Sequence, residues 1–263
     1  QGAITNDANV RFDQSTEGTY SGAMTGTGSL EKAGTGTVIM TGTNSHSGAT
    51  TLNAGTLRMV NSASGDGINT NTASAISYSI ASGATLEFNR TGGTSAIGKI
   101  DLSGEGTFKK TGSEELSHTS ADSTVALGSG ALFHVESGTY RFGGVTAGTW
   151  SSNLSDLQID SGATFNGAAT VIVVDSLNGA GTLKTGGGIT VGTDNSDGTF
   201  SGNIENSSYG SAKSLTKAGT GTQILNGTTT HTGTTTVNGG TLSLGSGYNH
   251  SGGGAFVVNA AGT

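Results

Sequence analysis

One phrase occurs twice in this chain, at residues 30–59 and again at residues 215–244. The copies read LEKAGTGTVIMTGTNSHSGATTLNAGTLRM and LTKAGTGTQILNGTTTHTGTTTVNGGTLSL. They share a lysine, Lys32 in the first and Lys217 in the second, and each lysine is followed by the same AGTGT. Repeated units of this kind bury their apolar faces against their neighbours, so the phrase predicts a stack of similar units.

A shorter unit, a strand followed by a glycine corner and a second strand, recurs along the chain. It is found in LNAGTLRM (52–59), IASGATLEF (80–88), VESGTYRF (135–142), IDSGATF (159–165) and VNGGTLSL (237–244). The corner glycines are separated by near multiples of about 24 to 28 residues, the length of a coil with three short strands and three corners. The sequence therefore predicts an all-β fold, a β-solenoid of about 10 coils with Gly-rich corners and short loop excursions.

Large apolar residues alternate with polar residues after each corner, as in TLRM and TLEF. A period of two with one apolar side indicates a half-buried strand, so the apolar side chains are expected inside. The intervening Arg58, Glu87 and Arg141 are expected to face water. The predicted core residues are Leu30, Leu57, Met59, Leu86, Phe88, Tyr140, Phe142, Phe165, Leu215, Val237, Leu242 and Leu244.

Composition narrows the classes of protein that the chain can belong to. The 48 glycines lack a three-residue period, which excludes collagen, and charged residues make up only 11%, which is atypical of disordered chains. Proline is absent, as suits interior strands, and the absence of cysteine excludes disulfide and thiol chemistry. A net charge of −7 with 11 scattered Lys and Arg argues against nucleic acid as a partner. Long apolar runs are also lacking, so we expect no membrane-inserted segment.

Both long copies follow L-x-K-x-G-x-G-T and then T-x-T-G-x-T-T-[LV]-N-x-G-T-L, and the first departs with Glu31 and Ser47. The second copy matches at Leu215, Lys217, Gly219, Gly221, Thr222, Gly227, Thr232, Gly233, Thr235, Thr236, Val237, Asn238, Gly240, Thr241 and Leu242. This pattern resembles the passenger-associated transport repeat of Gram-negative autotransporters. The resemblance implies a right-handed parallel β-helix, exported through a C-terminal outer-membrane barrel outside this sequence and then displayed on the bacterial cell surface or secreted.

We accordingly expect residues 1–263 to form a single β-helix segment of a larger passenger, with weaker coils between the two repeat copies. The chain has no starting Met and no signal-like apolar region, and FVVNAAGT (256–263) stops at a glycine corner. It is therefore expected to be a piece of a longer precursor that continues beyond Thr263.

Passengers of the family that the sequence resembles are most often adhesins or self-associating aggregation factors, although the family also contains proteases, esterases and toxins. We expect an adhesin or self-association segment that acts through multivalent polar contacts along the rod. Its partner would be an identical passenger on a neighbouring cell, or a host surface glycan or matrix protein. Two alternatives remain open: an export scaffold, or stalk, for a functional domain elsewhere, and a carbohydrate-active β-helix enzyme.

Candidate binding residues are sought where the chain departs from its repeat, because such loops carry specificity. The segment SEELSHTSADS (113–123) brings together Glu114, Glu115, His118 and Asp122, which could bind a metal or serve as acid and base. Their spacing fits no fixed ligand pattern, so a solvated loop leaving the rod is the favoured interpretation.

Two aromatic residues are further candidates. Trp150 lies in GGVTAGTWSSNLSD (143–156), where an exposed ring could stack on a sugar or a protein partner, but closure of the hydrophobic interior is the favoured role. Tyr209 lies in NIENSSYGSAK (203–213), another excursion from the repeat.

Recognisable catalytic and cofactor motifs are absent: there is no G-x-S-x-G, no H-E-x-x-H and no Walker loop. Asp194 and Asp197 lie in GTDNSDGT (192–199), whose spacing favours a polar turn over a calcium loop. His46 and His231 occupy equivalent repeat positions, which indicates a shared structural role. We therefore expect no enzyme activity, no catalytic residues, no metal and no cofactor.

Overall fold

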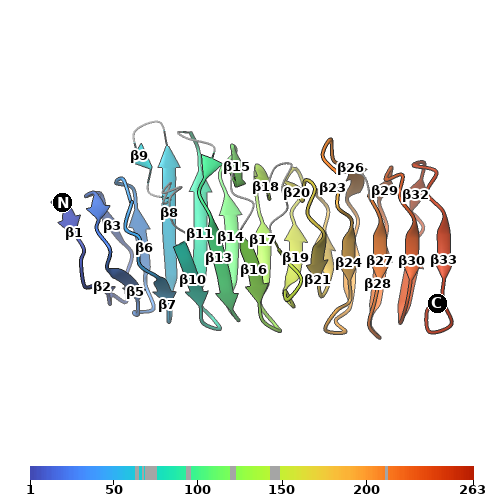
Figure 1. Ribbon diagram of the computed structural model, residues 1–263, viewed down its shortest axis with the longest axis horizontal. Coiled ribbons are helices and arrows are strands. Elements are labelled where there is room, and N and C mark those ends of the chain that lie inside the picture. Colours follow the sequence, from blue (N-terminus) through green and yellow to red (C-terminus); the bar gives the residue numbers. More distant parts are fainter. Residues whose placement is uncertain are drawn as a thin grey trace.

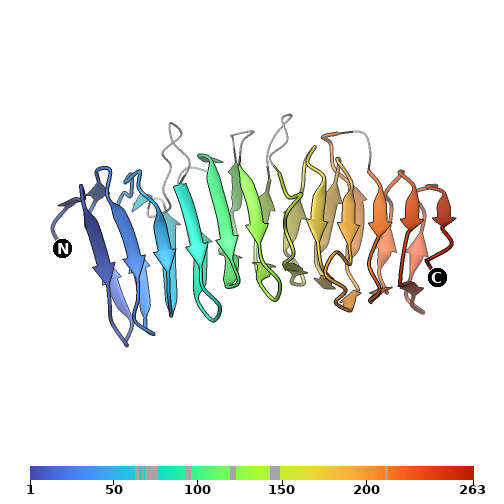
Figure 2. The same ribbon diagram turned by 60° about the horizontal axis from the view of Figure 1, so that its bottom comes forward.

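The computed structural model is a rod of stacked coils, with the N- and C-termini at opposite ends (Figures 1 and 2). It describes residues 1–62, 65–66, 68, 76–92, 96–118, 123–142, 149–210 and 213–263. Within these ranges the regular structure is entirely β, and no helix is present that is long and apolar enough to cross a membrane. The predicted all-β solenoid is confirmed.

In the described part of the chain the strands form five sheets, A to E, and every pairing between coils is parallel. Sheet A contains β1 (Ile4–Thr5) and β4 (Met24–Thr25). Sheet B contains β2 (Asn9–Phe12), β5 (Ser29–Lys32), β7 (Thr50–Leu52), β10 (Ile76–Ile80), β13 (Ile100–Gly104) and β16 (Thr124–Leu127). Sheet E contains β21 (Ile172–Val174), β24 (Ile189–Val191), β27 (Leu215–Lys217), β30 (Thr235–Val237) and β33 (Phe256–Val258).

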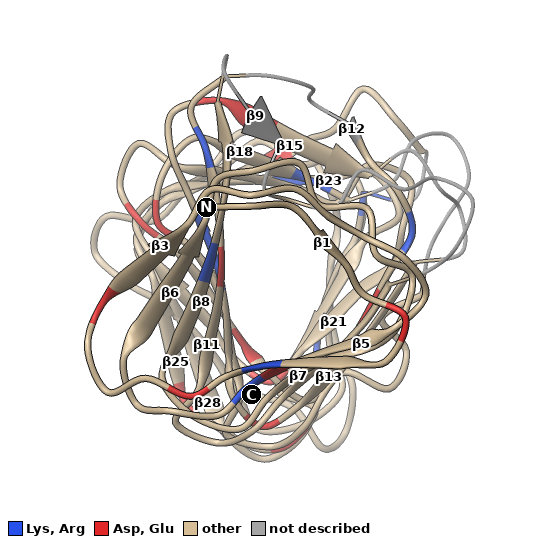
Figure 3. Cartoon of the chain, turned by 90° about the vertical axis from the view of Figure 1, so that its left-hand side faces the viewer, with Lys and Arg blue, Asp and Glu red and all other residues tan. Residues whose placement is uncertain are grey.

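Sheet C runs almost the whole length of the rod. It contains β3 (Gly18–Tyr20), β6 (Thr37–Met40), β8 (Thr56–Ser62), β11 (Thr85–Arg90), β14 (Thr107–Thr111), β17 (Leu132–Val135), β19 (Asp156–Ile159), β22 (Leu177–Gly179), β25 (Gly198–Phe200), β28 (Thr222–Leu225) and β31 (Thr241–Leu244), with β9 (Gly65–Asp66) antiparallel to β8. Sheet D contains β12 (Ala96–Ile97), β15 (Glu115–His118), β18 (Thr139–Arg141), β20 (Thr164–Asn166), β23 (Thr182–Thr185), β26 (Asn203–Asn206), β29 (Thr228–Thr229) and β32 (Asn249–His250). A complete coil passes from sheet B or E to sheet C and then to sheet D, and Figure 3 shows these three sides in projection along the rod.

The corners require glycine because the backbone turns sharply and approaches the preceding coil. Gly55 has φ +66°, a left-handed conformation that L side chains rarely adopt. A Cβ placed on Gly55 would also lie only 2.4 Å from the carbonyl oxygen of Gly36 in the coil before. The other predicted corner glycines, Gly83, Gly138, Gly162 and Gly240, also have positive φ.

The predicted alternation builds the core. Inward residues stack in register from coil to coil, as with Leu57 on Leu86 and Phe108 on Phe133. The predicted core residues Leu30, Leu57, Met59, Leu86, Phe88, Tyr140, Phe142, Phe165, Leu215 and Val237 are all at most 3% exposed.

Three predictions from the alternation need correction. Leu244 is 46% exposed and Leu242 only partly buried, because β31 is the last strand of sheet C and no further strand of that sheet covers them. Glu87, expected in water, is 5% exposed. Its carboxylate accepts hydrogen bonds from Arg58 Nε at 2.8 Å and from the Thr111 hydroxyl at 2.6 Å, so it lies in an outer polar network, desolvated but paired.

Three lysines lie inside the solenoid with 0% exposure: Lys32, Lys110 and Lys217. Each ammonium turns toward a corner and donates to backbone carbonyls of its own coil and the next. Lys110 Nζ donates to the carbonyls of Thr111, Gly112 and Ser137 at 2.8, 2.9 and 3.0 Å. Burial lowers the pKa of Lys110 to about 8. The repeat lysine is therefore a structural residue that satisfies corner carbonyls, a role that its charge alone did not predict.

The repeat histidines also have the shared structural role that their alignment predicted. His46 and His231 are 0% exposed. His46 Nε2 lies 3.0 Å from the Thr50 hydroxyl, and His231 Nε2 lies 3.0 Å from the Thr235 hydroxyl, four residues on in both copies. Both imidazoles bridge a corner to the strand that follows.

Candidate functional site

The segment 113–123, the best polar cluster in the sequence, is divided by the structure between core and surface. Its centre is strand β15 rather than the expected solvated loop. Glu115 is only partly buried, whereas Leu116, Ser117 and His118 are buried. Glu114 precedes the strand and is exposed, and Asp122 lies outside the described residues. The three described titratable groups therefore do not form one site on the surface.

His118 is a core residue, 1% exposed. Its Nε2 is hydrogen-bonded to the Tyr140 hydroxyl, and its ring packs against Tyr140 and Phe142 at centroid distances of 5.2 and 5.3 Å. Burial lowers the pKa of His118 to about 3, so the ring is neutral at physiological pH. A surface ligand does not reach this imidazole.

Trp150 is also buried, with 1% exposure. Its ring lies 5.0 Å from Phe133, 5.5 Å from Phe142 and 5.6 Å from Phe165, measured between ring centroids. The interpretation that it closes the interior is confirmed, and its alternative role as an exposed stacking platform is wrong.

Two of the candidates, Glu115 and Tyr209, contact the same residue, Arg141, on the outer side of sheet D. Arg141 joins them: its Nε donates to Glu115 at 2.9 Å, and its guanidinium carbon lies 5.8 Å from the centroid of the Tyr209 ring. A second pair, Lys184 and Glu205 at 3.7 Å, lies farther along the same outer face. We call these five residues the sheet D cluster. Within it, cations and carboxylates are equal in number.

Sequence reasoning placed Arg141 outside but missed its partners. The missed signal is the coil spacing: opposite charges about one coil apart on outward positions lie side by side, as Glu115 and Arg141 do. In register, Ser117 pairs with Arg141, Asn166 with Lys184, and Lys184 with Glu205.

Three of the predicted excursions include residues outside the described ranges, and each of these stretches follows a strand of sheet D in the chain. Residues 119–122 follow β15, residues 143–148 follow β18 and residues 211–212 follow β26, and each of these strands belongs to sheet D. The chain then returns to the side of sheets B and E, where Thr149 bridges Thr124 and β27 pairs β24.

The corner where sheets B and E lead into sheet C is acidic. Acidic side chains there and on the adjoining outer strand positions are Asp13, Glu31, Asp101, Glu105, Asp194 and Asp197. Arg11 is the neighbouring cation, 3.0 Å from Asp13 and 3.7 Å from Glu31.

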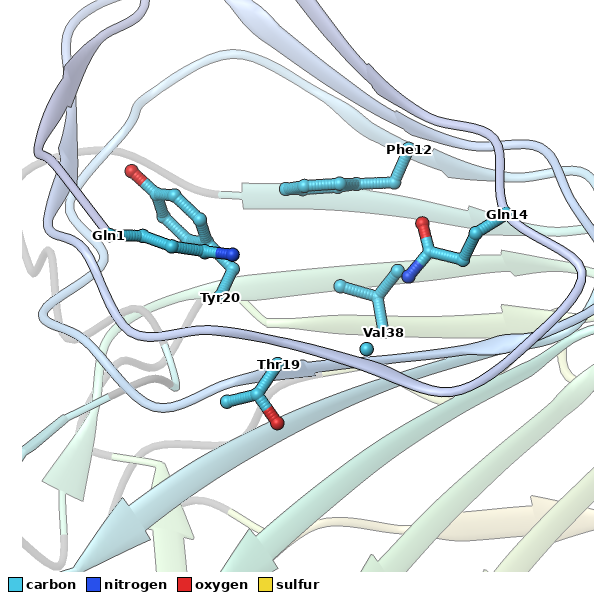
Figure 4. Close-up of a pocket in the computed structure, with 7 residues that line it drawn as sticks. Gln1, Phe12, Gln14, Thr19, Tyr20 and Val38 are labelled. Atoms are coloured by element: carbon cyan, nitrogen blue, oxygen red, sulfur yellow. The ribbon is translucent and has the colours of Figure 1, made fainter.

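A pocket opens at the N-terminal end of the rod and is lined by Gln1, Phe12, Gln14, Gly18, Thr19, Tyr20 and Val38 (Figure 4). Tyr20 and Val38 belong to the inward columns of sheet C. This hollow is the end of the hydrophobic interior.

The described residues contain no group of three or more His, Asp or Glu side chains placed to hold a metal ion. Their surface carries rows of hydroxyl, amide and paired charged groups.

The passenger-associated-transport-repeat family model matches the chain at residues 30–59 and 215–244, the two copies of the opening phrase. Searches of curated proteins and of solved structures returned no match. Two segments of the chain are thus similar to the passenger-associated transport repeat, and this similarity supports an autotransporter passenger domain.

Proposed function

Proceeding from these two repeats, we propose that the chain is a rod displayed on, or released from, the surface of a Gram-negative bacterium, where it mediates self-association between cells. The observation that carries the proposal is the difference between its sides. The acidic corner repels an identical rod, whereas the sheet D cluster carries balanced, opposite charges that a second copy can meet.

The mechanism is multivalent. Individual hydrogen bonds between wet polar surfaces contribute only about 1 kcal/mol each. Many such contacts along a rod, and many rods on each cell, add through effective concentration. The outward positions of sheet D supply a row of small polar residues for this purpose: Thr139, Thr164, Thr182, Asn203, Thr228 and Asn249.

Bead clumping at different salt concentrations tests the proposal. The purified chain on beads should clump more as salt rises, because the net charge of −7 is screened while close polar contacts persist. Arg141→Glu together with Lys184→Glu should weaken clumping, and Arg11→Glu on the opposite side should not. If beads fail to clump at any salt concentration, self-association is wrong and the stalk interpretation takes its place.

Cysteine cross-linking locates the interface independently, since the native chain has no Cys. Thr182→Cys on sheet D should form disulfide-linked dimers under oxidation. Thr216→Cys, outward on sheet E, is the matched control and should stay monomeric. Equal cross-linking of both variants contradicts an interface on sheet D.

A further inference from the structure

Sheet C is interrupted between β22 and β25. Neighbouring strands elsewhere in this sheet pair over several residues, but here only Gly179 and Phe200 pair. The backbone N–H and C=O of Leu177 are bonded instead by the side-chain amide of Gln223, at 3.0 and 2.8 Å. Gln223 comes from two coils farther on, so a side chain replaces the missing backbone ladder.

Gln223 stands in a column of apolar residues, and Gly198 makes its position possible. In the inward column of sheet C, Gln223 pairs with Gly198 on one side and Leu242 on the other. A Cβ on Gly198 would lie 2.5 Å from Gln223 Oε1, so only glycine leaves the amide room to reach Leu177. The first repeat copy has Val38 at the position equivalent to Gln223. The interruption is thus specific to this coil rather than a property of the repeat.

On the outer side of the same interruption, side-chain oxygens again accept hydrogen bonds from backbone N–H groups. The Thr199 N–H donates to Asn178 Oδ1 at 2.9 Å, and the Thr222 N–H donates to Asp197 Oδ1 at 2.6 Å. A pocket of about 340 Å³ opens here, lined by Asn178, Asp197, Gly198, Thr199, Thr222 and Ile224. The pocket is shallow and open to solvent.

We propose that this pocket binds one residue of a neutral glycan. Ile224 provides an apolar surface for the C–H face of a pyranose ring. The Asp197 carboxylate and the Thr199 and Thr222 hydroxyls surround it, and within the described residues neither hydroxyl is bonded to a protein group. Acceptors and hydroxyls around an apolar floor match a ring that carries hydroxyls at its rim.

The charge of the pocket selects among sugars. Asp197 is the one carboxylate in the lining, and Asp194 and the buried Asp175 lie at the same corner. Uronates, sialylated and sulfated sugars are therefore disfavoured by repulsion. A single carboxylate also lacks the second acid that glycoside hydrolysis requires, so the pocket binds without cleaving.

Two-dimensional NMR with ¹⁵N-labelled protein tests the site. The probes are methyl glucoside, methyl galactoside, methyl mannoside and N-acetylglucosamine, with glucuronate as the anionic comparison. At least one neutral sugar should shift the Thr199 and Thr222 amide signals with a dissociation constant of about 1 mM, and glucuronate should not. Absence of a localised shift with every neutral sugar, or equal shifts with glucuronate, overturns the proposal.

Substitutions in the pocket test whether the sugar binds there. Asp197→Asn keeps an oxygen that can accept a hydrogen bond from the Thr222 N–H, and Thr199→Val changes an exposed side chain, so both variants should fold. Each variant should weaken sugar binding about tenfold. Thr51→Val, outward on strand β7 of sheet B and outside the pocket, is the matched control with unchanged binding. Unchanged binding in both pocket variants, with native spectra, also overturns the proposal. The glycan site does not depend on self-association, and Thr199→Val should leave bead clumping intact. Failure of one proposal can therefore be distinguished from failure of the other.

Discussion

At the scale of single residues, the least expected feature is the burial of three lysine side chains. An ammonium group without a carboxylate partner is expensive to bury, yet Lys110 is enclosed at a corner by three carbonyls. Carbonyls at a sharp corner cannot all point along the sheet ladder, and a flexible four-carbon side chain brings a donor to several of them at once. The lysine ammonium thus loses its hydration and gains hydrogen bonds to backbone carbonyls in its place.

Replacement of Lys110 with Met should destabilise the fold by about 1–3 kcal/mol, because it leaves buried carbonyls without a donor. Lys109→Met is the matched control: that side chain points outward on the same strand and pairs with Glu136 at the surface, so its loss should cost at most about 1 kcal/mol. Urea unfolding of both variants measures the difference. Equal stability of the two variants would mean that the corner carbonyls need no donor.

At the scale of strands and corners, the sequence predicted what depends on local pattern. The two-residue alternation located the inward side chains of β8 and β11, and the glycines located the corners. It did not predict that Glu87 is desolvated beside Arg58, because that contact joins coils 29 residues apart. It also did not predict Gln223 reaching Leu177, which spans 46 residues. Contacts between coils require the register, which is known only once every coil length is known.

Two effects favour glycine at a corner: the positive φ, and the close approach of a backbone carbonyl from the preceding coil. Gly55→Ala meets both an unfavourable φ and a carbonyl at 2.4 Å, whereas Gly83→Ala has φ +79° but nothing within 4 Å of its Cβ. We expect about 1 kcal/mol of destabilisation for Gly83→Ala and about 2–4 kcal/mol for Gly55→Ala, measured by urea unfolding. If the two variants lose the same unfolding free energy, the close approach of the neighbouring coil adds no cost to that of the positive φ.

At the scale of the whole molecule, buried histidines are spread along the rod and tie its stability to pH. Burial lowers the pKa of His46 and His231 to about 4, and that of His118 to about 3, below the ordinary value of 6.5. Between those values the unfolded chain binds more protons than the folded chain, so the free energy of unfolding falls as pH falls. Their contribution is complete above about pH 6.5 and is progressively lost toward pH 4.

Urea unfolding at pH 7 and pH 5 should therefore show lower stability at pH 5, by about 1 kcal/mol per pH unit for each buried histidine. Double replacement, His46→Gln with His231→Gln, should flatten this dependence. His134→Gln, an outward residue that contacts Asp160, serves as control. A pH dependence unchanged by the double replacement would assign the acid sensitivity to other groups.

The parallel stacking of the coils has one more consequence. Strands pair with the coil immediately before and after them, as β23 does with β20 and β26, and the residues that pair are about one coil apart in the chain. A coil can therefore form as soon as the one beside it exists, without waiting for distant sequence. When such a chain is delivered end first through a narrow passage, every new coil buries apolar surface on the far side and opposes backward sliding.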